Sequence, residues 1–255
     1  MGSRLPVRKT ATHLLGIQME KKILVALITG EYVRRAEFLP SFIGLMRPEG
    51  SVTSTVHGQS PANGRNVIIQ QALDNNCTHI FFMDDDMVFP PDTLIKLIAH
   101  EKDIVSALYL GRGFPHRPVF FDAACDNGYC KYYSLTSESK GLVKGVNCGL
   151  GAVLISTEVF KKLERPWVRL GEIEKDGWCD DVVFFNRCRE VGYDIYCDLD
   201  SPVGHLGNMV IWPEVHDGEW MTNYKQHNGN VLMKQNIPTS QEIEEELKMK
   251  QLTLT

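Results

Sequence analysis

The sequence lacks several features that would assign a protein to a common class at once. Among its 255 residues no apolar run reaches the roughly 18 residues that a membrane span needs, and no Cys-x-x-Cys pair marks a zinc ribbon or redox motif. Charge of neither sign dominates, because 27 lysines and arginines stand against 32 acids, a net charge of -5. A global field that would hold nucleic acid is therefore excluded, whereas a local basic patch is not.

The cysteines and the composition point to an ordinary globular protein. The seven cysteines are odd in number and irregularly spaced, which favours reduced thiols in a cytosol. With 43% hydrophobic and 23% charged residues, a chain of this length forms a core without a disulfide or a structural metal. Residues 1–21 have no signal-peptide core, so we expect a leader or flexible arm there. The sequence thus predicts a soluble cytoplasmic protein.

From residue 22 onward, apolar strand-like segments alternate with helical ones. Strands are predicted at 22–29, 51–57, 79–83, 103–108, 152–155 and 193–197. Helices are predicted at 63–75, 93–100, 157–163 and 182–191. Segments rich in glycine, proline and aromatic residues predict loops with antiparallel strands at 111–140 and loops at 208–230. This order is typical of an α/β fold with a mixed, mostly parallel sheet flanked by helices.

Three consecutive aspartates, Asp84, Asp85 and Asp86, follow the apolar segment 79–83. Such a cluster is repulsive unless a cation neutralises it, and carboxylate oxygens suit Mg²⁺ or Mn²⁺. In an extended backbone Asp84 and Asp86 project to the same side, so both can face one ion or one ribose. Open α/β sheets bind ligands at strand ends, which favours a binding site over a solvated strand end or a helix-capping cluster.

The segment FFMDDDMVFPPDTLIKLI resembles the D-x-D region of nucleotide-sugar glycosyltransferases with the GT-A fold. Further pieces occur in that family's order, namely Arg65-Asn66, the glycine-rich segment 149–155, the acidic pair Asp180-Asp181, and His205 before Gly207. The resemblance covers about residues 22–207. It implies a single GT-A-like domain at 22–235, with a nucleotide and metal half at 22–110, an acceptor half at 111–235 and a helical tail at 236–255.

The resemblance also implies a metal and donor site. Asp86 would bind Mn²⁺ or Mg²⁺ directly, Asp84 would meet the ion or the donor's ribose, and His205 would complete the metal site. The metal would neutralise the departing diphosphate. Donor-binding roles are implied for Thr29, Glu31, Arg65, Asp84, Asp85, Gly149 and Gly151. Each of these residues also has an ordinary structural interpretation, such as a tight turn for the two glycines.

The acidic pair Asp180-Asp181 occupies the place where inverting members of the family keep Glu-Asp, whose second residue is the general base. Asp181 is therefore the predicted base. Aspartate stands at position 180 where glutamate is usual, which leaves the roles of Asp180 and Asp181 and the anomeric outcome open. The same pair is also suited to capping a helix. Trp178 is suited to forming an apolar wall for a sugar ring.

The expected reaction is transfer of a sugar from a nucleotide-sugar donor, UDP-linked first and GDP-linked next, to an acceptor hydroxyl. The acceptor stays open among a glycan, a protein and a hydroxylated pyrimidine in DNA. The last possibility reflects short soluble GT-A-like proteins of phages, which act in the host cytoplasm. The predicted loops carry side chains suited to any of these acceptors, namely Arg112, Arg117, Trp212, Trp220 and Tyr224.

Two other functions fit parts of the pattern. A haloacid dehalogenase-type phosphatase would use Asp84 and Asp86 in its D-x-D motif and Asp180-Asp181 as its magnesium pair. That motif normally lies on the first strand of the core, whereas here two strands and a helix are predicted before it. A non-catalytic sugar-binding module stays open, because each of these acids has a structural explanation.

Overall fold

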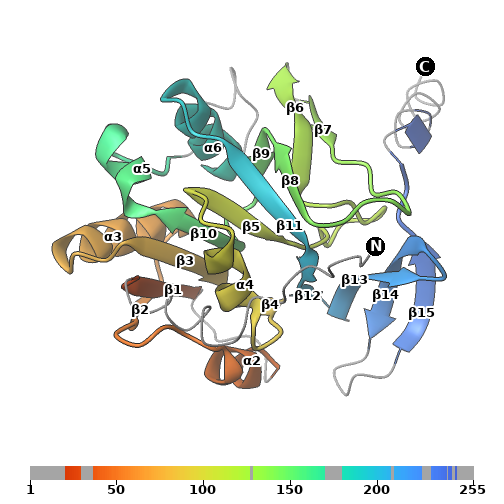
Figure 1. The fold of residues 1–255 in the computed structure, drawn as a ribbon, viewed down its shortest axis with the longest axis horizontal. Coiled ribbons are helices and arrows are strands. Elements are labelled where there is room, and N and C mark those ends of the chain that lie inside the picture. The colour runs from red at the N-terminus through yellow and green to blue at the C-terminus, as the bar shows by residue number, and fades with distance from the viewer. Residues whose placement is uncertain are drawn as a thin grey trace, which may run out of the picture.

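In a computed structural model of the chain, the described residues are 21–29, 37–126, 129–169, 180–207, 210–225, 231–239, 241–242 and 245. At the centre is a seven-stranded sheet in the order β2-β1-β3-β10-β5-β11-β8 (Figure 1). Its strands are β1 (Ile23–Thr29), β2 (Val52–His57), β3 (His79–Asp84), β5 (Ile104–Leu108), β8 (Leu142–Gly145), β10 (Ala152–Ser156) and β11 (Ile195–Pro202).

The predicted α/β class with a mixed, mostly parallel sheet is confirmed. β1, β2, β3, β5 and β11 run parallel, and β8 and β10 run against them. β1 is buried along its whole length, as its unbroken apolar sequence predicts for a parallel strand covered on both faces. Within the described residues, no helix is long and apolar enough to cross a membrane.

Helices cover both faces of this sheet. α3 (Pro61–Asp74), α5 (Thr157–Lys162) and α6 (Asp180–Glu190) pack on one face, and α2 (Phe38–Gly44) and α4 (Thr93–Ala99) pack on the other. The hydrophobic core between the sheet and α3, α5 and α6 is called the first core, and the one between the sheet and α2 and α4 is called the second. Successive strand residues point to opposite faces, so β1 supplies Leu24 to the first core and Val25 to the second.

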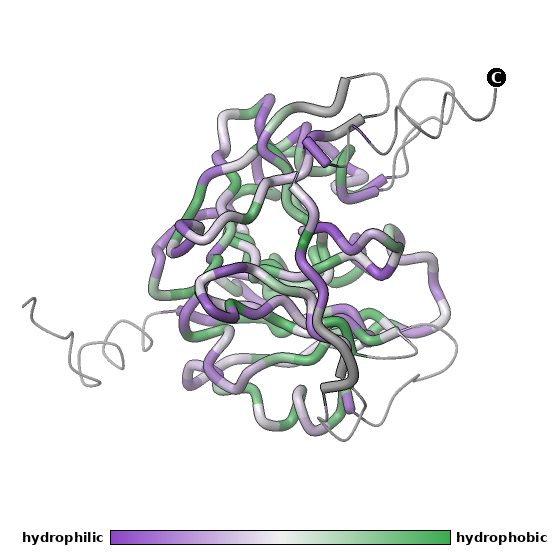
Figure 2. The backbone as a smooth tube through the Cα atoms, turned by 90° about the vertical axis from the view of Figure 1, so that its right-hand side faces the viewer, coloured by the Kyte–Doolittle hydropathy of each residue, from purple (hydrophilic) through white to green (hydrophobic). Residues whose placement is uncertain are grey.

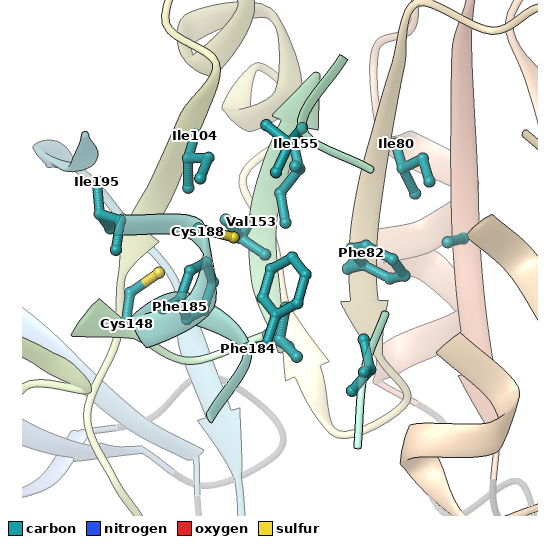
Figure 3. Packing of buried hydrophobic residues seen from close by; sticks show 14 of the residues in the cluster. Ile80, Phe82, Ile104, Cys148, Val153, Ile155, Phe184, Phe185, Cys188 and Ile195 are labelled. Carbon is teal, nitrogen blue, oxygen red and sulfur yellow. The ribbon is translucent and has the colours of Figure 1, made fainter. Parts of the chain in front are cut away.

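Aromatic rings bind the first core together. Phe160 of α5 meets Phe82 of β3 edge-on and stacks on Phe184 of α6, with ring centroids 6.5 and 5.9 Å apart. Figure 3 shows Phe184 and its neighbour Phe185 beside Val153 of β10. This packing fixes the position of α6, whose first turn carries the predicted acidic pair.

A five-stranded sheet lies beside the central one, in the order β15-β14-β13-β12-β4. Its strands are β4 (Met87–Val88), β12 (Gly204–Leu206), β13 (Val210–His216), β14 (Glu219–Lys225) and β15 (Val231–Asn236). The prediction of loops at 208–230 is therefore wrong. β13 and β14 form a hairpin around Asp217-Gly218, both with positive φ, which is a turn signal obscured in the sequence by Pro213 and by polar neighbours.

The segment 111–140 contains loops and antiparallel strands, as predicted. β6 (Phe120–Asp126) pairs with β7 (Tyr129–Tyr132) and with β9 (Asn147–Cys148). Figure 2 shows hydrophilic stretches (purple) recurring in the outer turns of the backbone, with hydrophobic stretches (green) between them. Of the predicted leader at 1–21, only residue 21 is described. Of the predicted helical tail at 236–255, the structure describes 236–239, 241–242 and 245, of which 236 ends β15 and 241, 242 and 245 are helical.

Candidate functional site

The carboxyl ends of β3 and β5 lie at the same end of the central sheet, and β10 lies between the two strands. Asp84 is the last residue of β3, and Tyr109 directly follows β5. Between them β10 begins, because it runs against both neighbours, and the Asp84 amide donates to the Gly151 carbonyl at 3.1 Å. The strand-end position predicted for Asp84 is thus confirmed, and Tyr109 joins it.

Arg65 connects Asp84 to the acidic pair of α6. Its Nη2 lies 3.0 Å from Asp84 Oδ1, and its Nη1 lies 2.6 Å from Asp180 Oδ2. Arg65 is only 5% exposed, and its Nε has no hydrogen-bond partner among the described residues. Burial opposes the charge of the guanidinium, but the carboxylates of Asp84, Asp180 and Asp181 outweigh burial and raise the pKa of Arg65. The guanidinium therefore stays charged and holds the carboxylates together.

The acidic pair lies where the sequence predicted it, in the first turn of α6. Carboxylates are favoured there because the helix N-terminus carries unpaired amides and a positive dipole end. Asp181 Oδ1 accepts a hydrogen bond from the Val182 amide at 2.9 Å. Asn147 of β9 donates from its side-chain amide to the Val182 carbonyl at 3.3 Å and so fastens the start of α6 to the three-stranded sheet formed by β7, β6 and β9.

Tyr109 is a site residue that the sequence reasoning missed. Its side chain is buried, and burial, together with the nearby Asp181 and Asp84 carboxylates, raises its pKa well above the usual value. The hydroxyl therefore stays protonated at neutral pH and can donate a hydrogen bond. The signal was present in the sequence, because Tyr109 follows the predicted strand 103–108 just as Asp84 follows the predicted strand 79–83.

A second group forms around Asp86. Asp86 Oδ2 lies 3.0 Å from Arg112 Nη1 and 3.5 Å from His205 Nε2. His205 Nδ1 lies 2.8 Å from the Leu110 carbonyl, which can only accept, so Nδ1 carries the proton. In the neutral ring, Nε2 then offers a lone pair on the side of Asp86, which is how metal-binding histidines are commonly oriented.

The extended backbone expected through the aspartate triplet is wrong. Asp85 and Asp86 form a turn between β3 and β4, because the chain passes there from the central sheet to the five-stranded sheet. As a result Asp84 pairs with Arg65 and Asp86 pairs with Arg112. Among the described residues, no three His, Cys, Asp or Glu side chains gather closely enough to hold a metal ion by themselves. Asp86 and His205 are the two predicted ligands that the structure brings together.

Gly149 and Gly151 make room for the site residues. A Cβ on Gly149 would lie 1.9 Å from the Tyr109 hydroxyl oxygen, and one on Gly151 would lie 3.1 Å from Asp84 Oδ2. Real Cβ contacts essentially never fall below 3.0 Å, which excludes a Cβ at Gly149, whereas the 3.1 Å contact at Gly151 is tight and would require Asp84 to shift by a few tenths of an ångström. These glycines therefore have a packing reason that is independent of any donor sugar.

Gly149→Ala is expected to lower the free energy of unfolding by about 1–3 kcal/mol, because the added methyl group overpacks the buried Tyr109 hydroxyl. Urea unfolding followed by tryptophan fluorescence measures this change. Gly113→Ala is the matched control, since nothing lies within 4 Å of a Cβ there and its φ is not positive. Equal unfolding midpoints for the two variants would contradict the packing role of Gly149.

Of the remaining predicted residues, Thr29 ends the strand next to the one that carries Asp84, and the others lie outside the described residues. Thr29 is 2% exposed, and its hydroxyl lies 2.7 Å from His57 Nδ1 on the neighbouring strand β2. In the sheet register Asp84 is paired with Ile28, one residue before Thr29. Glu31 and Trp178 lie outside the described residues.

Comparisons with known proteins bear on the fold alone. No family model matches the chain, and no curated protein matches it. Among solved structures, the crystal structure of A197 from STIV is similar, with a TM-score of 0.55 and 16% sequence identity, over 86% of this chain and 96% of that chain. At this identity the likeness shows a shared fold and nothing of the activity. The chain thus has an α/β fold that spans nearly the whole of A197.

Proposed function

We propose that this protein is a metal-dependent glycosyltransferase that moves a sugar from a nucleotide-sugar donor, with UDP as the first choice and GDP as the next, to an acceptor hydroxyl. The observation that carries the proposal is the meeting of the D-x-D acids, the helix-opening pair and His205 at one edge of the sheet. These residues come from three separate parts of the sequence. Arg65 joins Asp84 to Asp180, and Tyr109 lies near Asp84 and Asp181 and packs edge-on against His205, with ring centroids 5.6 Å apart.

Asp86 and His205 are the residues that would hold Mn²⁺ or Mg²⁺. The fit is chemical, because a carboxylate and an imidazole whose Nδ1 is engaged by a carbonyl are both suited to Mn²⁺. When bound, the ion would supply positive charge against the departing diphosphate. Arg112 reaches Asp86 from a half-exposed position and is therefore placed to meet a diphosphate at the same spot.

Asp181 would act as the general base. The Arg65 guanidinium lies 2.6 Å from Asp180, which gives Asp180 a positioning role. Asp181, the second residue of the pair, would take the proton from the acceptor hydroxyl at a carboxylate oxygen. The helix N-terminus favours the ionised form that a base needs. Direct attack by the activated hydroxyl inverts the anomeric centre, so the proposed reaction is an inverting one.

Calorimetric titration of UDP and GDP with Mn²⁺, and again with EDTA, tests the donor site. We expect binding that needs the metal, and a loss of at least about 10- to 100-fold in Asp86→Ala, since that is the usual loss of metal affinity when only a residue supporting a ligand is removed. Asp194→Ala is the control, because this aspartate makes a surface ion pair with Lys144 and should leave binding unchanged.

Two outcomes would contradict the proposed function. If neither nucleotide binds under any condition, the chain has no donor site of this type. If phosphate is instead released from phosphomonoesters in a reaction that depends on Asp84, the phosphatase alternative replaces the transferase.

A further inference from the structure

A separate hollow of about 520 Å³ lies between the loop at 137–140, the end of β11 and the β13–β14 hairpin. Its volume falls within the roughly 300–1,000 Å³ that is usual for small-ligand sites. The proposed donor site shares no side chain with it among the described lining residues. The lining combines two indoles with hydroxyl and charged groups, from Ser137, Lys140, Asp200, Trp212, Glu214 and Trp220.

Hydrogen bonds join the walls of this hollow to one another. Trp220 Nε1 donates to the Ser139 carbonyl at 3.2 Å, which ties β14 to the loop. The Gly141 amide donates to Asp200 Oδ1 at 3.0 Å, and the Leu199 amide donates to the Gly141 carbonyl at 2.9 Å, which ties the loop to β11. The hollow is therefore formed before any ligand arrives.

The chemistry of the lining selects a neutral, hydroxyl-rich ligand. The partly exposed indole of Trp212 offers an apolar ring face, on which the C–H face of a pyranose can pack. Asp200 and Glu214 bring two carboxylates against the single ammonium of Lys140, so the charged groups of the lining carry one net negative charge. Asp200 already accepts from the Gly141 amide and Glu214 from the Asn223 side-chain amide, but a carboxylate can accept about four hydrogen bonds. Sugar hydroxyls can therefore also donate to these carboxylates, whereas the phosphates of a nucleotide or nucleic acid are repelled.

The hollow adjoins the proposed metal site along the chain. Pro202 lines the hollow, and His205 follows three residues later, a span of at most about 11 Å even when fully extended. Trp212 packs closely on Gly204, where a Cβ would lie 2.6 Å from the indole Cε3. A ligand in the hollow therefore lies near the residues proposed to hold the metal and the donor.

We propose that this hollow binds a neutral sugar unit of the acceptor, which makes the acceptor a glycan. The sugar binding stands on the hollow itself, whereas its assignment to an acceptor rests on the proposed glycosyl transfer. Among the three acceptor classes, a glycan supplies the neutral, ring-shaped unit that the lining matches, and DNA supplies the charge that the lining opposes.

Ser137→Trp tests this site because Ser137 is exposed on the loop, where an indole can fill the hollow without disturbing the core. Glu138→Trp is the matched control, since Glu138 is the exposed neighbour and is absent from the lining. Trp212 is left in place because of its packing on Gly204. The probes are methyl glycosides and β-linked disaccharides of glucose, galactose, mannose and N-acetylglucosamine, followed by ligand-observed NMR with the full chain.

We expect at least one disaccharide to bind the wild type and Glu138→Trp equally, and to bind Ser137→Trp at least about tenfold more weakly. The affinity for UDP with Mn²⁺ should be the same in all three proteins. The inference is overturned if no probe binds, if Ser137→Trp binds like the wild type, or if a short DNA duplex displaces the sugar. Sugar binding without nucleotide binding would instead contradict the proposed glycosyl transfer, while the hollow would still be a sugar-binding site.

Discussion

Arg65→Ala is expected to lower the free energy of unfolding by about 3 kcal/mol, the lower end for breaking a buried ion pair, because Asp84 keeps some contact with solvent. The alanine removes the guanidinium from between Asp84 and Asp180 and leaves two carboxylates facing each other. It also frees the first turn of α6 from β3. Urea unfolding gives the change in free energy, and a change in midpoint without a change in slope shows that the stability itself has changed.

Arg112→Ala is the matched control for this prediction. The two arginines pair with aspartates at the same distance, 3.0 Å for Arg112 with Asp86 and 3.0 Å for Arg65 with Asp84. Arg112 differs in burial, since its side chain is 48% exposed, and exposed pairs contribute at most about 1 kcal/mol. If Arg65→Ala unfolds at the same urea concentration as Arg112→Ala, the buried ion pairs of Arg65 stabilise the fold no more than the exposed ion pair of Arg112.

The fold could be predicted to the level of its class because its signals are local. The spacing of apolar residues and the turn residues that flank them predict both the buried strand β1 and the helix after β2. The reversed direction of β10 could not be predicted, since an apolar run such as 152–155 has the same pattern whether the strand runs parallel or antiparallel to its neighbours. The hairpin at Asp217-Gly218 was missed although its turn signal is strong, because Pro213 lies within the first strand.

In the candidate site too, local sequence patterns predict some features, whereas others depend on contacts between residues far apart in the sequence. Asp84 at a strand end and Asp180 at a helix start follow from local pattern, and both positions are confirmed. The bond from Arg65 to Asp180 joins residues 115 apart in the sequence, so it depends on how α3 and α6 pack over the sheet. The role of Gly149 likewise depends on Tyr109, which reaches it from another strand. The packing of the folded core determines side-chain partners of this kind, and a short sequence motif does not predict them.

Asp181→Asn is expected to slow glycosyl transfer by about 10²–10⁴-fold, the usual contribution of a general base. Asparagine keeps the size of the side chain and its acceptor oxygen for the Val182 amide, but it cannot take the proton from an acceptor hydroxyl. Transfer to acceptor and hydrolysis of the donor are measured separately, together with the affinity for UDP and Mn²⁺. We expect unchanged nucleotide affinity, because the proposed metal ligands lie elsewhere in the site.

Asp180→Asn distinguishes a base from a positioning residue. It removes the charged partner of Arg65, so its loss of rate should come with a lower urea midpoint than that of Asp181→Asn, which keeps the ion pair between Arg65 and Asp180. NMR of the first product formed reports the anomeric configuration, which an inverting base at Asp181 requires to be opposite to that of the donor. Full transfer activity in Asp181→Asn, with none in a well-folded Asp180→Asn, would make Asp180 the base. The hydrogen bond from Arg65 would then orient the reacting carboxylate, and the roles of the two aspartates would be exchanged.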